Sequence, residues 1–123
     1  MSEQKQKLLN KQDFFKVQDI TIEPVALPAP YEGVVYVRTM TGEEWDAYQD
    51  SILVRDKDGK REVDLKNSRA KMIVQSICDA DGVALFTEKD IPELSKRGSK
   101  VLEVMAKAAQ RLNGVGEDSS KNA

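Results

Sequence analysis

The chain has 123 residues, of which 40% are hydrophobic and 33% are charged. A chain of this length forms one domain that buries roughly two thirds of its unfolded surface, so it folds without disulfides. Its 19 basic and 21 acidic residues give a net charge of −2, which argues against a nucleic-acid partner. Because it lacks a signal peptide and any run of ~18 apolar residues, we predict a soluble cytosolic protein with no membrane partner.

The chain begins with a polar arm. Residues 1–9 are rich in Gln and Lys, which predicts a flexible N-terminal arm ahead of a single domain over residues 10–114. Asn10 stands three residues before Asp13, a spacing that predicts a capped, short helical turn next to Phe14.

Two segments near the N-terminus have the character of strands. Residues 20–25 alternate in apolar character, and Pro24 restricts such a strand to the edge of a sheet. Residues 33–39 are dominated by β-branched and aromatic side chains, and Gly33 marks their start. Together these segments predict a small β-hairpin.

Helical periodicity begins at Thr41. Thr41 and Glu44 have the spacing of a capping box, in which each side chain accepts a hydrogen bond from the other residue's backbone amide. Residues 56–59, Asp-Lys-Asp-Gly, predict a turn that ends this helix and belongs to a charged excursion. The apolar residues of the predicted helix share one face: Trp45, Tyr48 and Ile52.

A second helix is predicted within residues 64–78, where apolar residues recur at i, i+3, i+4, i+7 and i+8. Residues 79–82, Asp-Ala-Asp-Gly, predict the next turn. We expect residues 83–86 to return to the core, with Phe86 as an anchor, and a short helix to begin at Thr87.

The last helix is predicted over residues 99–113, because apolar side chains form a broad face there and Gly114 is well placed to end it. Residues 115–123 are polar and predicted to be disordered. The elements together predict an α+β fold that is mainly α, with a small N-terminal β-hairpin followed by a bundle of about four helices.

No catalytic constellation is present in the sequence. Without any histidine, the chain lacks the commonest general base and the commonest metal ligand. Asp79, Asp81 and Glu88 match the third, fifth and twelfth positions of an EF-hand loop, but Ile77 occupies the first position and cannot bind calcium. We therefore predict a solvated turn, no metal, no cofactor and no enzymatic activity.

The single cysteine, Cys78, cannot form an internal disulfide, which agrees with a reducing compartment. Its spacing from Ile73, Val74 and Ile77 places it on the apolar stripe of the predicted helix. Burial raises the pKa of a thiol and shields it, so we interpret Cys78 as a structural residue.

Apolar helix faces remain as candidates for binding a partner. A helix-in-groove interface uses such faces, with aromatic residues as anchors. Core packing is the alternative interpretation for every candidate, and for the aromatic pair it is favoured by their helical register. The candidates on the two helices are Trp45, Tyr48 and Ile52, and Val101, Met105 and Leu112.

Several common motifs follow one another over roughly residues 20–114. They are Val34-Val35-Tyr36-Val37-Arg38, Met40-Thr41-Gly42-Glu43-Glu44, Asn67-Ser68-Arg69-Ala70-Lys71-Met72-Ile73-Val74, Cys78-Asp79-Ala80-Asp81-Gly82, Leu85-Phe86-Thr87 with Asp90-Ile91, and Ala108-Ala109-Gln110-Arg111-Leu112-Asn113-Gly114. In their order and spacing they resemble a known family, the tail assembly chaperones of long-tailed (siphophage-type) bacteriophages and prophages. The charged segment from Arg55 to Arg61 does not match the family closely.

The resemblance implies a non-catalytic protein that binds and solubilises the tape measure protein and helps tail tube subunits assemble around it. It also implies a homo-oligomer, in the form of a ring or a spiral. A longer, frameshifted form is typical of the family and recruits the tail tube protein; the present chain resembles the short, unshifted product. The resemblance implies that the protein is located in the cytoplasm of the infected or lysogenic host and is absent from the mature virion. The alternative is a structural head–tail connector or tail completion protein that the virion retains.

Overall fold

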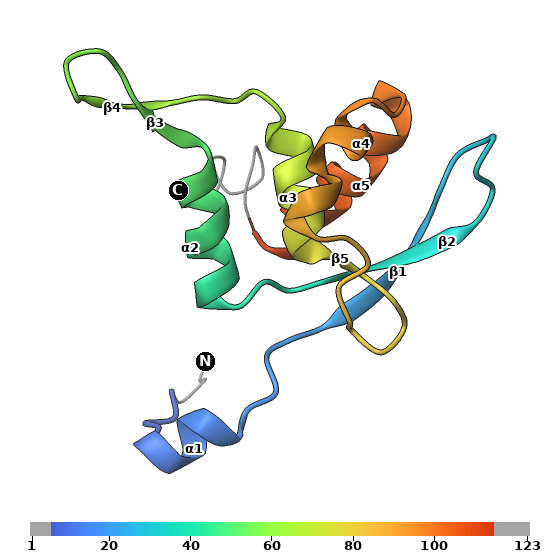
Figure 1. The fold of residues 1–123 in the computed structure, drawn as a ribbon. Coiled ribbons are helices and arrows are strands. Elements are labelled where there is room, and N and C mark those ends of the chain that lie inside the picture. The colour runs from blue at the N-terminus through green and yellow to red at the C-terminus, as the bar shows by residue number, and fades with distance from the viewer. Residues whose placement is uncertain (1–5, 115–123) are drawn as a thin grey trace.

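The computed structural model describes residues 6–114 (Figure 1). Part of the predicted arm over residues 1–9 therefore lies outside the described residues. The whole of the predicted tail over residues 115–123 also lies outside them. In chain order the elements are α1 (Lys11–Lys16), β1 (Ile22–Ala26), β2 (Val34–Arg38), α2 (Gly42–Ser51), β3 (Leu53–Arg55), β4 (Arg61–Val63), α3 (Ser68–Ser76), β5 (Ile77–Cys78), the 3₁₀ helix η1 (Glu88–Asp90), α4 (Ile91–Ser95) and α5 (Ser99–Leu112).

The predicted N-terminal hairpin is confirmed as part of a three-stranded antiparallel sheet in the order β1–β2–β5. β1 forms an edge of this sheet, so Pro24, which faces Tyr36 in the register, costs no hydrogen bond to a further strand. The Leu27 amide donates to the Gly33 carbonyl at 2.8 Å and continues the ladder past the strand ends. Val37 on the central strand is fully buried and packs in the hydrophobic core with Val25 of β1 and Ile77 of β5.

The core lies between this sheet and three helices. α3 packs on both α5 and α4, and α5 also packs on β2, so the apolar faces of α3 and α5 meet under the sheet. α2 contacts α3 from the other side and α1 stands apart from the body, as Figure 1 shows. The α+β class is confirmed, but a bundle of about four helices is not, because α4 spans only five residues and the sheet takes part of the core. None of the described helices is long and apolar enough to cross a membrane.

The predicted capping box at the start of α2 is confirmed. The Glu44 amide donates to the Thr41 hydroxyl at 3.1 Å, and the Thr41 amide donates to the Glu44 carboxylate at 2.9 Å. The charged excursion that follows α2 contains a second hairpin, in which β3 and β4 pair around the predicted turn. Its strands lie away from the sheet and the core helices (Figure 1).

The helix predicted within residues 64–78 is shorter in the structure. α3 ends at Ser76, and Ile77 and Cys78 leave it in extended backbone to pair with β2. Both side chains are fully buried, as their place on the apolar stripe predicted, but they reach the core from a strand. Pairing with the exposed edge of β2 provides backbone hydrogen bonds and burial together, and this outweighs continuation of the helix.

The two Asp-x-Asp-Gly turns share one geometry. In the first, the Asp56 carboxylate accepts from the amides of residues 58 and 60, each at 2.9 Å. In the second, the Asp79 carboxylate accepts from the amides of residues 81 and 83, at 2.8 and 3.0 Å. The glycines that end the motifs, Gly59 and Gly82, have φ of 82° and 83°, a conformation that glycine adopts at no steric cost.

Gly82→Ala should lower the free energy of unfolding by about 1–2 kcal/mol, because an L-residue is strained at this positive φ. The added Cβ would meet only the flexible end of Ile22, whose Cδ1 lies 3.0 Å from its position, so backbone strain dominates. Gly42→Ala is the matched control, since no atom lies within 4 Å of its added Cβ and its φ is not positive. Urea unfolding of both variants measures the difference, and equal stability of the two would contradict the strain argument.

Candidate partner-binding surface

Three of the six predicted partner-binding residues belong to the core. Ile52, Val101 and Met105 are each less than 10% exposed. Val101 and Met105 point from α5 into the cluster that α3 and the sheet complete. Burial of these three side chains favours the core-packing interpretation, and their role in binding stays a prediction.

The other three candidates lie at the margin of the core. Trp45 and Tyr48 are half-buried on α2, with ring centroids 5.6 Å apart, and Leu112 is half-buried at the end of α5. Burial of the Tyr48 side chain raises the pKa of its hydroxyl above the usual value, because desolvation disfavours the charged phenolate. Each of the three packs on the core and keeps part of its surface exposed, so their role in binding stays a prediction.

An ion pair between Arg38 and Glu44 links the start of α2 to the sheet. The Arg38 guanidinium, on β2, donates from Nη2 to the Glu44 carboxylate and, at 3.4 Å, to the Gln75 carbonyl at the end of α3. The Met40 amide also donates to the Asn113 side-chain carbonyl at 2.7 Å, which joins the same region to the end of α5. The aromatic pair on α2 is therefore presented from a helix that three elements hold in place.

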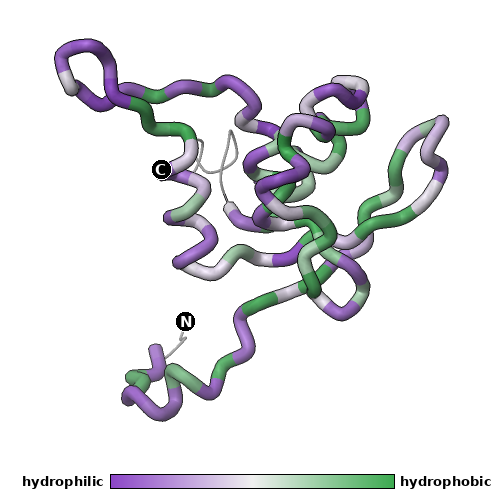
Figure 2. The backbone as a smooth tube through the Cα atoms, viewed as in Figure 1, coloured by the Kyte–Doolittle hydropathy of each residue, from purple (hydrophilic) through white to green (hydrophobic). Residues whose placement is uncertain are grey.

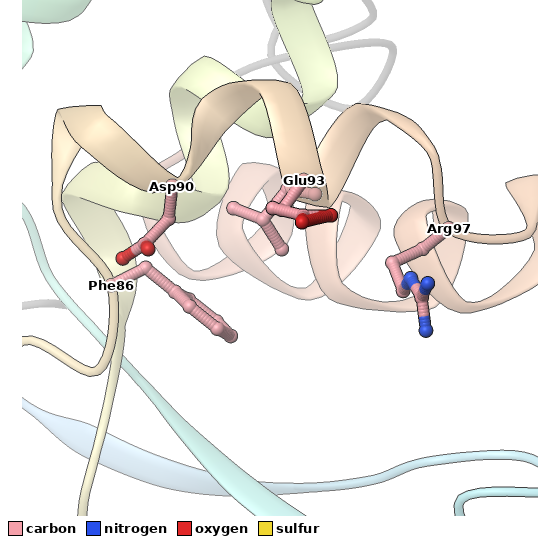
Figure 3. Close-up of a pocket in the computed structure, with 5 residues that line it drawn as sticks. Phe86, Asp90, Glu93 and Arg97 are labelled. Carbon is pink, nitrogen blue, oxygen red and sulfur yellow. The ribbon is translucent and has the colours of Figure 1, made fainter.

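A shallow hollow of about 180 Å³ lies beside η1 and α4 (Figure 3). Phe86 and Leu94 give it an apolar lining, and Asp90, Glu93 and Arg97 bring charges to it. The Asp90 carboxylate is engaged by the Thr87 amide at 2.8 Å. The sequence did not predict a hollow here, although the i, i+3 and i+7 spacing of the three charged residues is typical of one face of a helix.

Phe86 contacts the core only in part, which corrects the expectation for residues 83–86. Val83 and Leu85 are exposed, and only Phe86 packs against the buried cluster. The chain stays at the surface here because the Ala84 backbone bridges to Cys78 and the Leu85 amide donates to the Ile77 carbonyl at 3.1 Å. The segment thus extends the edge of the sheet and leaves apolar side chains beside the hollow.

The structure also places the two groups that the sequence offered for chemistry, the Cys78 thiol and the Asp79 carboxylate. Cys78 is fully buried, and desolvation raises the pKa of its thiol despite the opposing charge of Arg38, so it is a poor nucleophile. Residues 6–114 contain no group of three or more acidic, cysteine or histidine side chains placed to hold a metal. The Asp79 carboxylate is occupied by backbone amides, as described above.

A solved structure shares the described fold. The bacteriophage HK97 tail assembly chaperone aligns with a TM-score of 0.56 over 76% of this chain and 85% of its own length. The two sequences are 18% identical, so the likeness establishes a common fold, and at that level it confirms the family resemblance seen in the sequence. No family model matches the chain, and no curated protein matches it.

Proposed function

We propose that this chain is a non-catalytic tail assembly chaperone that binds and solubilises the tape measure protein of a long-tailed phage or prophage. In this role it helps tail tube subunits assemble around the tape measure protein. The observation that carries the proposal is the fold shared with the HK97 tail assembly chaperone over most of both chains.

The physical task of such a chaperone is to cover apolar stripes. A long helical protein exposes its stripes to water until a tube encloses it, and large exposed apolar patches cause aggregation. The half-exposed Trp45, Tyr48 and Leu112 fit the aromatic and apolar anchors of a helix-in-groove contact. Weak contacts repeated over many copies would hold the stripe and still release it when the tube forms.

The proposal includes further partners and a location. The chain would act in the cytoplasm of the infected or lysogenic host as a homo-oligomer, and a longer, frameshifted product would recruit the tail tube protein. Mass spectrometry of infected cells should then find peptides of this chain joined to a C-terminal extension. Mass spectrometry of purified virions should find no peptide of this chain, and its presence at stoichiometric level would argue for a structural component instead.

Co-expression with the tape measure protein of the same genome tests the central claim. The tape measure protein should be insoluble when expressed alone and should become soluble and co-purify when this chain is present. Trp45→Ala should weaken the interaction roughly tenfold, as expected for the loss of an interface anchor.

Val63→Ala is the matched control, since this side chain is 60% exposed on β4 and belongs to none of the proposed anchors. Near-UV circular dichroism of each variant verifies that it is folded. A tape measure protein that stays insoluble with the wild-type chain present would refute the proposed function. Unchanged binding by a folded Trp45→Ala variant would remove α2 from the binding surface.

A further inference from the structure

The segment ahead of β1, residues 6–21, exposes two aromatic side chains and is called the arm below. Phe14 and Phe15 on α1 are 62% and 75% exposed, and their rings meet edge to face with centroids 5.3 Å apart. No residue of α1 is buried. Asn10 caps the helix by accepting from the Asp13 amide at 2.8 Å, so the two rings are presented from a formed turn.

Apolar residues on either side of α1 enlarge this exposed surface. Along the arm, hydrophobic residues alternate with hydrophilic ones (Figure 2). Exposed aromatic and aliphatic side chains gathered on one short segment are typical of an interaction site. The exposed apolar residues of this segment are Leu8, Leu9, Phe14, Phe15, Val17 and Ile20.

The hollow beside α4 has the complementary character. Its floor is formed by Phe86 and Leu94, and its volume of about 180 Å³ suits a side chain of aromatic size. Glu93 and Arg97 stand at its rim (Figure 3), and within residues 6–114 neither takes part in an ion pair. The rim therefore offers one negative and one positive group to an incoming segment.

The arm carries the matching charges. Asp13 and Lys16 flank Phe14 and Phe15 on α1, and neither forms an ion pair in the described part of the chain. If the ring of Phe14 or Phe15 occupied the hollow, the acidic and the basic side chain of α1 would lie near the two rim residues, which also carry one charge of each sign. Burial of the ring would supply affinity, and the charges would select the orientation.

We propose that α1 of one copy docks into the hollow between Phe86 and Leu94 of a second copy, with Lys16 against Glu93 and Asp13 against Arg97. In the structure the hollow of a copy is not filled by its own arm, because α1 lies well separated from α4 (Figure 1).

Docking of this kind joins two different surfaces of the chain. Two copies that exchange their arms reciprocally form a closed two-fold dimer, and a contact that passes from each copy to the next generates a ring or an open helical array. The inference deepens the homo-oligomer of the proposed function, but it concerns the chain alone and stands apart from binding of a tape measure protein.

Two double variants test the contact from its two sides. Phe14→Ser with Phe15→Ser removes the arm's rings, and Glu93→Lys with Arg97→Glu reverses the rim. All four side chains are exposed, so both proteins should remain folded. Sedimentation velocity of the wild-type full chain should show assembly that grows with concentration, and each double variant alone should self-associate at least about tenfold more weakly.

A mixture of the two double variants is the decisive measurement. Each has kept the surface that the other has lost, so the mixture should form a one-to-one dimer that cannot extend, while each variant alone is monomeric. Val63→Ser is the control, and it should assemble like the wild type. A wild-type chain that is monomeric at every concentration, an arm variant that assembles normally, or a mixture that stays monomeric would each overturn the proposal. If a monomeric chain solubilises the tape measure protein, the docking proposal is overturned and the chaperone role is retained.

Discussion

Replacing Ile73 with alanine should lower the free energy of unfolding by about 2–5 kcal/mol, the cost of a large-to-small change in a close-packed core. Ile73 has no exposed surface and lies on α3, the helix that contacts α2, α4 and α5. The cavity would therefore border several elements at once, which limits how far it can collapse. Because a whole domain is stable by roughly 5–15 kcal/mol, urea unfolding should show a large shift of the midpoint.

Val63→Ala on β4 provides the comparison for this prediction. Its side chain is 60% exposed, so truncation should change stability by no more than about 0.5 kcal/mol. Similar losses in the two variants would contradict the assignment of α3 to the centre of the core.

Arg38→Met should lower the free energy of unfolding by about 1.5–3 kcal/mol, the range for hydrogen bonds made by charged groups. Arg38 and Glu44 have side chains that are only 16% and 24% exposed, so solvent screens their attraction less than at an open surface. Without Arg38 the Glu44 carboxylate is left largely buried beside an apolar side chain, and the contact to the Gln75 carbonyl is lost as well. Thermal and urea unfolding both measure the loss.

A double-mutant cycle with Glu44→Gln separates the ion pair from the other contacts of Arg38. Glutamine keeps the acceptor that caps the Thr41 amide, and it carries no charge to be stranded. Arg38→Met should therefore cost less in the Glu44→Gln protein than in the wild type, by about 1 kcal/mol or more. An equal cost in both backgrounds would show that the pair is not coupled, and would assign the effect to packing of the arginine stem.

Local signals were enough to predict several elements. The capping box at Thr41 and Glu44 involves only residues on one helical turn, so its spacing determines its structure. The position of Pro24 at a sheet edge is also a local effect, because proline has no backbone N–H to donate to a further strand. The Asp-x-Asp-Gly turns are local because the first Asp carboxylate accepts a hydrogen bond from the amide two residues later. The family resemblance relied on the order of such parts, and the HK97 tail assembly chaperone agrees with it at the level of the fold.

Long-range pairing produced the differences from prediction. Ile77 and Cys78 continue the apolar stripe of α3 in sequence, yet they form β5 because the edge of β2 lies beside them in the fold. Residues 83–86 were expected to enter the core and instead extend this edge, which leaves Val83 and Leu85 exposed. Periodicity reports that a residue will be buried, but it does not report which backbone conformation buries it.

The sequence by itself determined the α+β class, the hairpin, the capped helices, the turns and the absence of a histidine-based site, because these follow from composition and from contacts a few residues apart. Only the tertiary structure decided which apolar residues are available to a partner. Ile52, Val101 and Met105 are buried. Phe14 and Phe15 are exposed on α1, and Phe86 lines the hollow beside α4. An amphipathic pattern gives a helix an apolar face, and the packing of distant segments determines whether that face is covered.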